Sequence, residues 1–295
     1  MPCFSPLSAY QCMDGRIIFS ERAGNDVARS LTLKCGQCIG CRLERSRQWA
    51  VRCLHEASMH ESNCFVTLTY DAEHLSGPSL HYPDFQRFLK RLRRRSSSAV
   101  RFYMAGEYGE LNARPHYHAL LFGFDFLDKL YIGKSPGGSK LYRSSMLEDL
   151  WPFGFSSVGD VNFESAAYVA RYCMKKVTGE AAVKHYEVID EDGVVSSRSP
   201  EFNRMSLKPG VGANWFKRFQ SDVYPHGMVV VNGVECRPPR YYDKLFERDD
   251  GVEYGLLQFR RDLEARALAH DNTPERLEVK RKVVEARVGR LLKKL

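Results

Sequence analysis

The sequence predicts an α+β protein in which strands and helices follow each other in the order β-α-β-β-α-β. Three observations lead to this class. The segment between Pro115 and Gly123 is almost wholly apolar from Tyr117 on, which is typical of a buried strand. Residues 100–107 form a second such stretch, and the glycine- and proline-containing segment between the two indicates a hairpin. An amphipathic helix is expected before the hairpin, over residues 84–95.

Length and charge limit the class of protein further. With 295 residues, the chain can bury a core as one large domain or two. The net charge of +8 and a pI near 9.0 favour an anionic partner such as nucleic acid. No stretch approaches the ~20 apolar residues of a membrane span, and the N-terminus lacks a signal-peptide core. We therefore expect no membrane partner, and a reducing cytoplasm in which the nine cysteines are thiols or bind metal.

Three cysteines stand close together in the N-terminal part, with the spacing C-x2-C-x2-C. They are Cys35, Cys38 and Cys41. Zinc takes four thiolate or imidazole ligands, and a glycine-bearing C-x2-C turn supplies two of them. Cys3 or Cys12 would complete the set if the N-terminal arm folds back, and Cys3 is our first choice. The alternative interpretation is a group of thiols that begins a helix, some of them merely buried.

Two helices in the first third of the chain carry many arginines. One is expected over residues 42–60, with an apolar face and arginines off that face. The other begins after Pro83 and carries six cations, among them Arg91, Arg94 and Arg95. Cations in a last turn suit the helix dipole. Because six exceed that need, we predict contacts of this helix with a phosphate backbone.

The predicted strand 116–123 carries His116 and His118, which project to one face because alternate residues of a strand do so. A metal ion held by both rings would satisfy them together. Glu107, at the end of the first hairpin arm, is expected directly across the ladder as a third ligand, with Glu110 as the competing candidate. The alternatives are two buried histidines bonded to backbone and a solvated loop carboxylate.

Strands are expected at residues 64–70 and 155–161, and a helix at residues 144–150. A further helix is expected over residues 164–177. It carries Tyr168 and Tyr172 four residues apart, hence on one face, with Arg171 and Lys175 three residues beyond each. A tyrosine is a competent nucleophile only when its target is strongly activated, for example by a metal ion and a nearby cation. The alternative is a pair of tyrosines that pack the helix onto the sheet.

The C-terminal part has weaker signals. We expect hairpins over residues 184–198 and 228–237, a basic loop over 203–212, and helices over 214–220, 254–270 and 274–295. The basic end of the last helix is open to three interpretations: a solvated face, a partner surface or a DNA contact. The predicted division is an N-terminal cysteine-rich arm with a basic helix (1–60), a central domain (61–180) and a C-terminal extension (181–295).

The strand with Thr67-Leu-Thr69, the Pro-His-Tyr-His strand and the paired tyrosines together resemble the three motifs of HUH endonucleases. More closely, the chain resembles the replication initiators of the Microviridae, phages with small circular single-stranded DNA, and among these the gokushovirus type. The resemblance covers most of residues 30–245. It is carried by residues 35–49, 65–70, 106–123 and 151–176, with further likeness at 205–212 and 239–243.

The resemblance implies a ferredoxin-like (RRM-like) HUH palm, an antiparallel sheet with packed helices. An N-terminal cysteine-rich element and a C-terminal α/β extension with terminal helices would flank it. It also implies that Glu107, His116 and His118 bind Mg²⁺ or Mn²⁺ in the palm, and that a tyrosine attacks DNA. The family's tyrosine motif resembles a doubled Y-x-x-K. The second copy here ends in Lys175, whereas the first ends in Arg171, which keeps the charge but changes its geometry.

The implied activity is rolling-circle initiation. One tyrosine would nick an origin in single-stranded or supercoiled circular DNA, leaving a 5′-phosphotyrosine and a 3′-hydroxyl primer, and the second would rejoin a circle. The implied partners are the host replication polymerase and helicase, in the cytoplasm of the infected bacterium. Arg114, Arg171 and Lys176 are further candidates for DNA contacts. The competing interpretations are a non-catalytic, zinc-containing nucleic-acid-binding protein and an HUH relaxase or transposase of a mobile element.

Overall fold

A computed structural model describes residues 3–20, 26–75, 77–109, 112–135, 137–171, 176–177, 179–189 and 192–292 of the chain. The chain forms two compact units. The larger is Ser46–Leu257, and the smaller combines Met1–Arg45 with Gln258–Leu295. The predicted three-part division at residues 60 and 180 stays a prediction.

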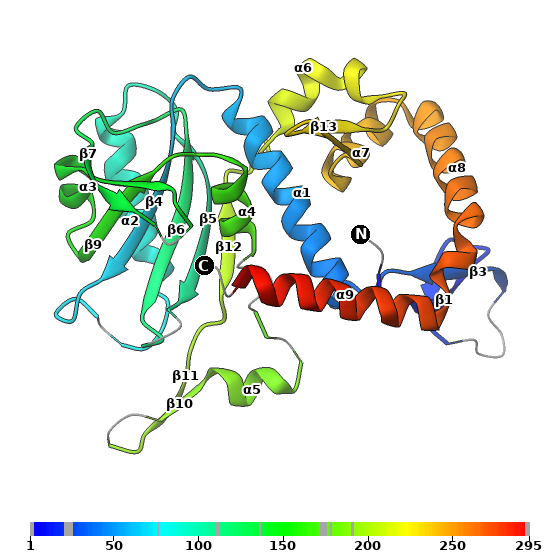
Figure 1. Cartoon of the computed structure of the whole chain (residues 1–295), viewed down its shortest axis with the longest axis horizontal. Helices are drawn as coiled ribbons and strands as arrows, with labels where there is room; N and C mark the ends of the chain where they lie inside the picture. The colour runs from blue at the N-terminus through cyan, green and yellow to red at the C-terminus, as the bar shows by residue number, and fades with distance from the viewer. Residues whose placement is uncertain are drawn as a thin grey trace. The chain divides into compact units, whose positions relative to one another are not determined.

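The larger unit is built on an antiparallel sheet of seven strands in the order β12-β5-β6-β4-β9-β8-β7 (Figure 1). The α+β class is thus confirmed. The four predicted strands form the centre: β4 (Asn63–Tyr70), β5 (Arg101–Tyr108), β6 (Pro115–Phe122) and β9 (Gly154–Gly159). Three outer strands were not predicted: β7 (Leu130–Lys134), β8 (Lys140–Arg143) and β12 (Phe202–Met205). The basic loop expected over residues 203–212 therefore begins as an edge strand paired with β5.

Helices α2 (Tyr82–Arg95) and α3 (Ser145–Leu150) cover one face of this sheet (Figure 1). Helix α2 begins with proline in its first turn, as predicted, and buries Phe85 and Phe88 against the sheet residues Val66 and Tyr117. Val66 and Tyr117 alternate along their strands with residues that point to the opposite face. The first face is therefore a closed hydrophobic core.

The opposite face is covered by α1 (Ile39–Ala57) and α4 (Phe163–Arg171). Ala50 of α1 and Ala166 of α4 are fully buried with Tyr103 and Leu120 of the sheet. Small side chains let these helices lie close to the strands. The predicted helix 164–177 is thus confirmed to residue 171. Residues 172–175 lie outside the described part, and residues 176–177 are not helical.

The remaining part of the larger unit, residues 181–257, contributes Phe216, Tyr242 and Phe246 to a third core. Its hairpins lie close to the predicted positions, although α5 replaces the first residues of the hairpin expected from 184. Helix α7 was not predicted. The elements are α5 (Ala181–Tyr186), β10 (Glu187–Ile189), β11 (Val195–Ser197), α6 (Ala213–Val223), β13 (Val229–Val231), β14 (Val234–Cys236) and α7 (Arg240–Asp249).

The smaller unit contains a three-stranded sheet and the C-terminal helix. Its strands, in the order β2-β1-β3, are β1 (Leu7–Cys12), β2 (Ile17–Ile18) and β3 (Val27–Leu33). Helix α8 (Gly251–Ala267) enters it from the larger unit, followed by η2 (Ala269–Asn272) and α9 (Pro274–Leu292). The hydroxyl of Thr273 caps α9 by accepting from the amide of Arg276. Within the described ranges, no helix is long and apolar enough to cross a membrane.

Candidate active site

The hairpin of β5 and β6 brings a carboxylate to two imidazoles. Glu107 pairs with His116 in the ladder, and His118 follows two positions along the same strand. Glu107 Oε1 lies 2.7 Å from His116 Nε2 and 3.1 Å from His118 Nε2. Glu107 therefore lies directly across the ladder from His116, as expected. Glu110, the competing candidate, lies outside the described residues.

Glu107 is ionised in this setting although it is 2% exposed. Burial by itself would raise the pKa of its carboxyl, because a charge is poorly solvated there. The hydrogen bonds from His116 and His118, together with their charges, outweigh burial and lower this pKa to about 2. The sheet thus holds a carboxylate anion in its interior, where a neighbouring positive charge stabilises it.

The contacts of His116 fit a cation at this point. Its Nδ1 lies 3.1 Å from the carbonyl oxygen of Arg114, which can only accept, so Nδ1 carries a hydrogen. In a neutral ring, Nε2 is then an acceptor, yet it faces Glu107 Oε1 at 2.7 Å. Two acceptors at that distance repel each other. Either a charged imidazolium or a metal ion bound by Nε2 and Oε1 removes the conflict.

His118 is held from behind by a hydroxyl. Its Nδ1 lies 3.0 Å from Thr67 Oγ1 on β4, and its ring stacks on Phe65 with centroids 5.7 Å apart. A metal-bound histidine ordinarily uses its second nitrogen in this way, which fixes the ring's orientation. Thr67 entered the sequence analysis only as part of a motif. The register of β4 against β6, which pairs Thr67 with His118 and Thr69 with His116, places it on the histidine face, and the sequence analysis did not predict this role.

Tyr168 of α4 lies against the histidines. Its ring centroid is 5.1 Å from that of His118, with the rings nearly perpendicular at 81°. Arg171 is one turn further, with Cζ 6.0 Å from the centre of the Tyr168 ring. Tyr168 and the cation three residues after it therefore lie beside the group formed by the Glu107 carboxylate and the two imidazoles. Tyr172 and Lys175 lie outside the described residues.

The predicted DNA contacts on α2 lie on the other face of the sheet, because α2 packs against the first core. Arg91 donates two hydrogen bonds to the carbonyl of Leu150, at 2.7 and 3.0 Å. Arg95 forms an exposed ion pair of 3.5 Å with Asp149. These two arginines help to hold α3. Part of the basic run on α2 therefore has a structural role that needs no DNA.

The other predicted DNA contacts differ in their surroundings. Arg114 donates from Nη1 to the carbonyl of Tyr70 at 3.0 Å, next to the start of the histidine strand. Arg94 and Lys176 are exposed. Binding of DNA by any of these cations stays a prediction.

A second ligand cluster lies in the smaller unit. The sulfur atoms of Cys3, Cys35, Cys38 and Cys41 all lie within 4.8 Å of one another. Cys12, the other candidate for a fourth ligand, is buried in β1 and is not a member of this group. Both ligand groups could hold a metal ion, and their donors differ: sulfur in one, nitrogen and oxygen in the other.

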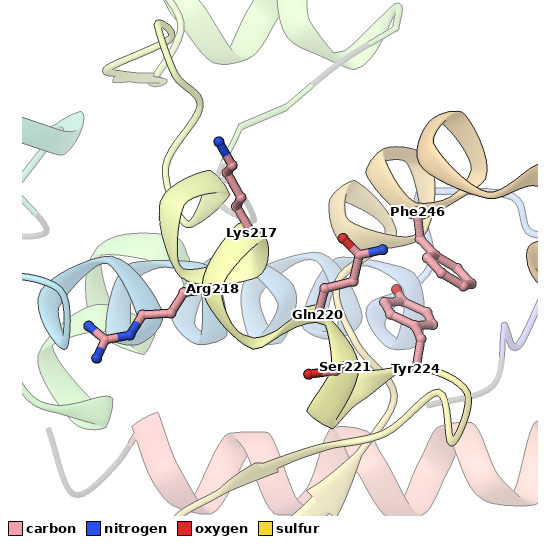
Figure 2. A pocket seen from close by; sticks show the side chains of 6 residues that line it. All are labelled: Lys217, Arg218, Gln220, Ser221, Tyr224 and Phe246. Atoms are coloured by element: carbon pink, nitrogen blue, oxygen red, sulfur yellow. The ribbon is translucent and has the colours of Figure 1, made fainter.

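An open hollow of about 330 Å³ on α6 and α7 is lined by residues of neither ligand group (Figure 2). Tyr224 and Phe246 stack there with ring centroids 4.0 Å apart, while Lys217 and Arg218 point away from the stack. The Tyr224 hydroxyl donates to Asp243 at 2.8 Å. The hollow thus consists of aromatic packing and solvent-facing side chains, with no group of metal ligands among those that line it.

Comparison with known proteins agrees with the motifs. Residues 63–177 match the family described as replication-associated protein ORF2/G2P. The replication-associated protein VP4 of Bdellovibrio phage phiMH2K is 31% identical over 280 residues, which cover 91% of this chain and 84% of VP4. The replication-associated protein ORF2 of Spiroplasma virus 4 is also 31% identical, covering 87% of this chain and 83% of ORF2.

A third relative is the replication-associated protein ORF4 of Chlamydia phage 1, 31% identical over 228 residues, or 74% of this chain and 54% of ORF4. No solved structure matches the chain. The likeness to the first two relatives extends over most of their length, well beyond the histidine strand. The chain therefore belongs to the phage replication-associated proteins of the Microviridae type.

Proposed function

We propose that this protein is a metal-dependent HUH endonuclease that starts rolling-circle replication of a circular phage genome. The observation that carries the proposal is the group of Glu107, His116 and His118 with Tyr168 beside it. A carboxylate and two imidazoles on one face of the central sheet, with a phenol from the helix that covers that face, are the parts that this chemistry needs.

The arrangement of strands supports a ferredoxin-like palm. Counted along the chain, β4, β5, β6 and β9 are the first to fourth strands, and they lie side by side in the order fourth, first, third, second. Helices α2 and α3, which follow the first and third of these strands, pack on the same face. This is the split β-α-β arrangement expected of such a palm.

Glu107, His116 and His118 would hold one Mg²⁺ or Mn²⁺ ion, and two imidazoles suit Mn²⁺ better. When bound, the ion withdraws electron density from the scissile phosphate. Thr67 and the carbonyl of Arg114 keep the two rings in place through their second nitrogens. The protein therefore presents its ligands already oriented, so that little reorganisation accompanies binding of DNA.

The tyrosines carry the bond exchange. The hydroxyl oxygen of Tyr168 or Tyr172 attacks phosphorus and loses its proton while the bond from phosphorus to the 3′-oxygen breaks. The departing 3′-oxygen takes up a proton and becomes a free hydroxyl, and the DNA 5′-phosphate stays on tyrosine. Arg171 and Lys175 offset the negative charge at phosphorus. Because one phosphodiester replaces another, the step is reversible, and the second tyrosine can rejoin a circle.

The biological setting follows from this chemistry. The substrate is an origin in single-stranded or supercoiled circular DNA, contacted by Arg114, Arg171 and Lys176 and, away from the site, by Arg91, Arg94 and Arg95. The free 3′-hydroxyl primes a host polymerase, and a host helicase opens the duplex. The protein acts in the cytoplasm of the infected bacterium.

The test is a covalent adduct. The full chain is incubated with the circular genome of its source, with Mn²⁺, with Mg²⁺ or with chelator, and separated under denaturing conditions. We expect a protein–DNA band and a free 3′-end that polymerase extends, with either metal but not with chelator. Binding of DNA without any adduct in either metal would instead identify a non-catalytic DNA-binding protein.

A further inference from the structure

Four cysteine sulfurs meet at the point where the N-terminal arm reaches the start of α1, within the smaller unit. Cys3 Sγ lies 3.5 Å from Cys35 Sγ and 3.9 Å from Cys38 Sγ. A disulfide needs a sulfur–sulfur distance of about 2.05 Å, and all four cysteines are free thiols. A regular tetrahedron of sulfurs, each about 2.3 Å from zinc, has edges of about 3.8 Å. One of the two measured sulfur–sulfur distances is slightly shorter than such an edge, and the other is slightly longer.

Backbone amides point at these sulfurs. Phe4 N donates to Cys38 Sγ at 3.3 Å, and Cys35 N donates to Cys3 Sγ at 3.3 Å. Cys35 Sγ accepts from two amides of the following turn, those of Gln37 at 3.4 Å and Cys38 at 3.3 Å. A neutral thiol is a weak acceptor, whereas a thiolate is a strong one that such donors stabilise. The backbone is thus arranged around negatively charged sulfur.

The local chain path explains how a short segment supplies three of the four sulfurs. Gly36 has a φ of +75°, in the left-handed region that a turn between two cysteines requires. The amide of Arg42 then donates to the carbonyl of Cys38 at 3.0 Å, which begins α1 and sets Cys41 on its first turn. Arg45 Nη2 donates to the carbonyl of Gly36 at 3.3 Å and closes the turn from the helix side.

We propose that Cys3, Cys35, Cys38 and Cys41 bind one structural zinc ion through four thiolates. Soft sulfur ligands select zinc over Mg²⁺ and Mn²⁺, and a closed set of four leaves no position for substrate. This ion would be separate from the one proposed at Glu107, His116 and His118, whose donors are nitrogen and oxygen. Its role is to pin the arm at Cys3 to the start of α1 across 32 residues of chain.

The test measures the metal in the full chain, purified without a metal-affinity tag and dialysed against buffer free of zinc. We expect one zinc per chain by elemental mass spectrometry, and its release by a mercurial thiol reagent in step with modification of four thiols. Cobalt in place of zinc should give the absorption of a tetrahedral tetrathiolate. These measurements use the parent protein, so they do not depend on whether a variant folds.

Variants then assign the ligands. Cys38→Ala should lose at least nine-tenths of the zinc, whereas Cys12→Ala, a change at a buried cysteine of the same unit outside the cluster, should keep it. His118→Ala should also keep it, so this inference and the proposed endonuclease can fail independently. Full zinc in Cys38→Ala, iron in place of zinc, or zinc far below one per chain in the parent would overturn the proposal.

Discussion

The two ligand clusters of this chain are assembled in different ways. Glu107, His116 and His118 come from two adjacent strands, and the register of one hairpin sets their separation. The cysteines come from an arm, a turn and a helix start, with Cys3 32 residues before Cys35. The first group is embedded in the central strands of the larger unit, whereas the second lies where the chain enters its first long helix.

This difference indicates what an ion contributes at each place. Ladder hydrogen bonds and two packed faces hold the first group whether or not an ion is bound, so a bound ion would add chemistry more than stability. At the cysteines, the ladder of β1 and β3 ends at Leu7 and Leu33. Beyond that point the arm meets the helix start through the sulfurs and their amide donors, so the binding energy of an ion there would become folding energy. We therefore expect ligand loss to affect activity at one cluster and local folding at the other.

The largest effect is expected for His118→Ala and His116→Ala. A metal ion contributes several kcal/mol to the transition state, so either change should slow DNA cleavage by about 1000-fold or more. The melting temperature should change little by comparison with Cys38→Ala. The control is His74→Ala, an exposed histidine in the same unit that pairs with Asp71. Cleavage by His118→Ala at the rate of the parent would remove the central claim.

The tyrosine pair tests the proposed nucleophiles in place of the proposed metal ligands. Tyr168→Phe and Tyr172→Phe should each leave some cleavage of a simple oligonucleotide, since the other hydroxyl can act, and the double variant should form no adduct. Circle closure, which needs two successive transfers, should fall in both single variants. Peptide mapping of the adduct on the parent protein is decisive. DNA found on only one tyrosine throughout nicking and rejoining would make the other a packing residue.

Thr67→Val sharpens the claim that the sheet pre-orients the histidines. Without the hydroxyl 3.0 Å from His118 Nδ1, the ring is less firmly held, and we expect the Mn²⁺ concentration for half-maximal cleavage to rise about 10- to 100-fold. Cleavage at saturating Mn²⁺ should change less. Thr67→Ser keeps the hydroxyl and should behave as the parent. Equal Mn²⁺ requirements in the valine and serine variants would show that Thr67 only fills space.

His55 is a buried histidine outside both ligand groups, and its replacement should produce the smallest effect. It is 8% exposed, stacks on Trp215 with centroids 3.5 Å apart, and lies 3.0 Å from the hydroxyl of Tyr242. Burial lowers the pKa of His55 from 6.5 to about 4, so its neutral form is favoured in the folded state. The stability that it contributes is present above pH 6.5 and is lost as the pH falls towards 4.

Denaturant unfolding at pH 7 and pH 4.5 measures this loss. We expect His55→Asn, which does not titrate, to lose about 1–2 kcal/mol less of its free energy of unfolding than the parent over this range. DNA cleavage at pH 7 should stay within a few-fold of the parent. An unchanged pH dependence in His55→Asn would assign the acid sensitivity of the protein to other groups.

Much of the fold could be predicted because periodicity records which side of an element is buried. The β-branched and aromatic residues of 64–70 and the apolar run from Tyr117 to Gly123 identified two of the central strands, and the spacing of Phe85 and Phe88 identified α2. The outer strands β7, β8 and β12 were not predicted, because they have only 4 or 5 residues and several of these residues are exposed. Such short edge segments do not differ enough from loops in sequence.

The sequence by itself determined the family, the histidine face and the two tyrosines as candidates, because motif spacing and strand alternation are local properties. Only the tertiary structure decided between alternatives that depend on distant segments. It paired Glu107 with His116, brought Cys3 rather than Cys12 to the other cysteines, and set the α2 arginines on the face away from the histidines. Which side of an element is buried is written in neighbouring residues, whereas which elements meet depends on the packing of the whole unit.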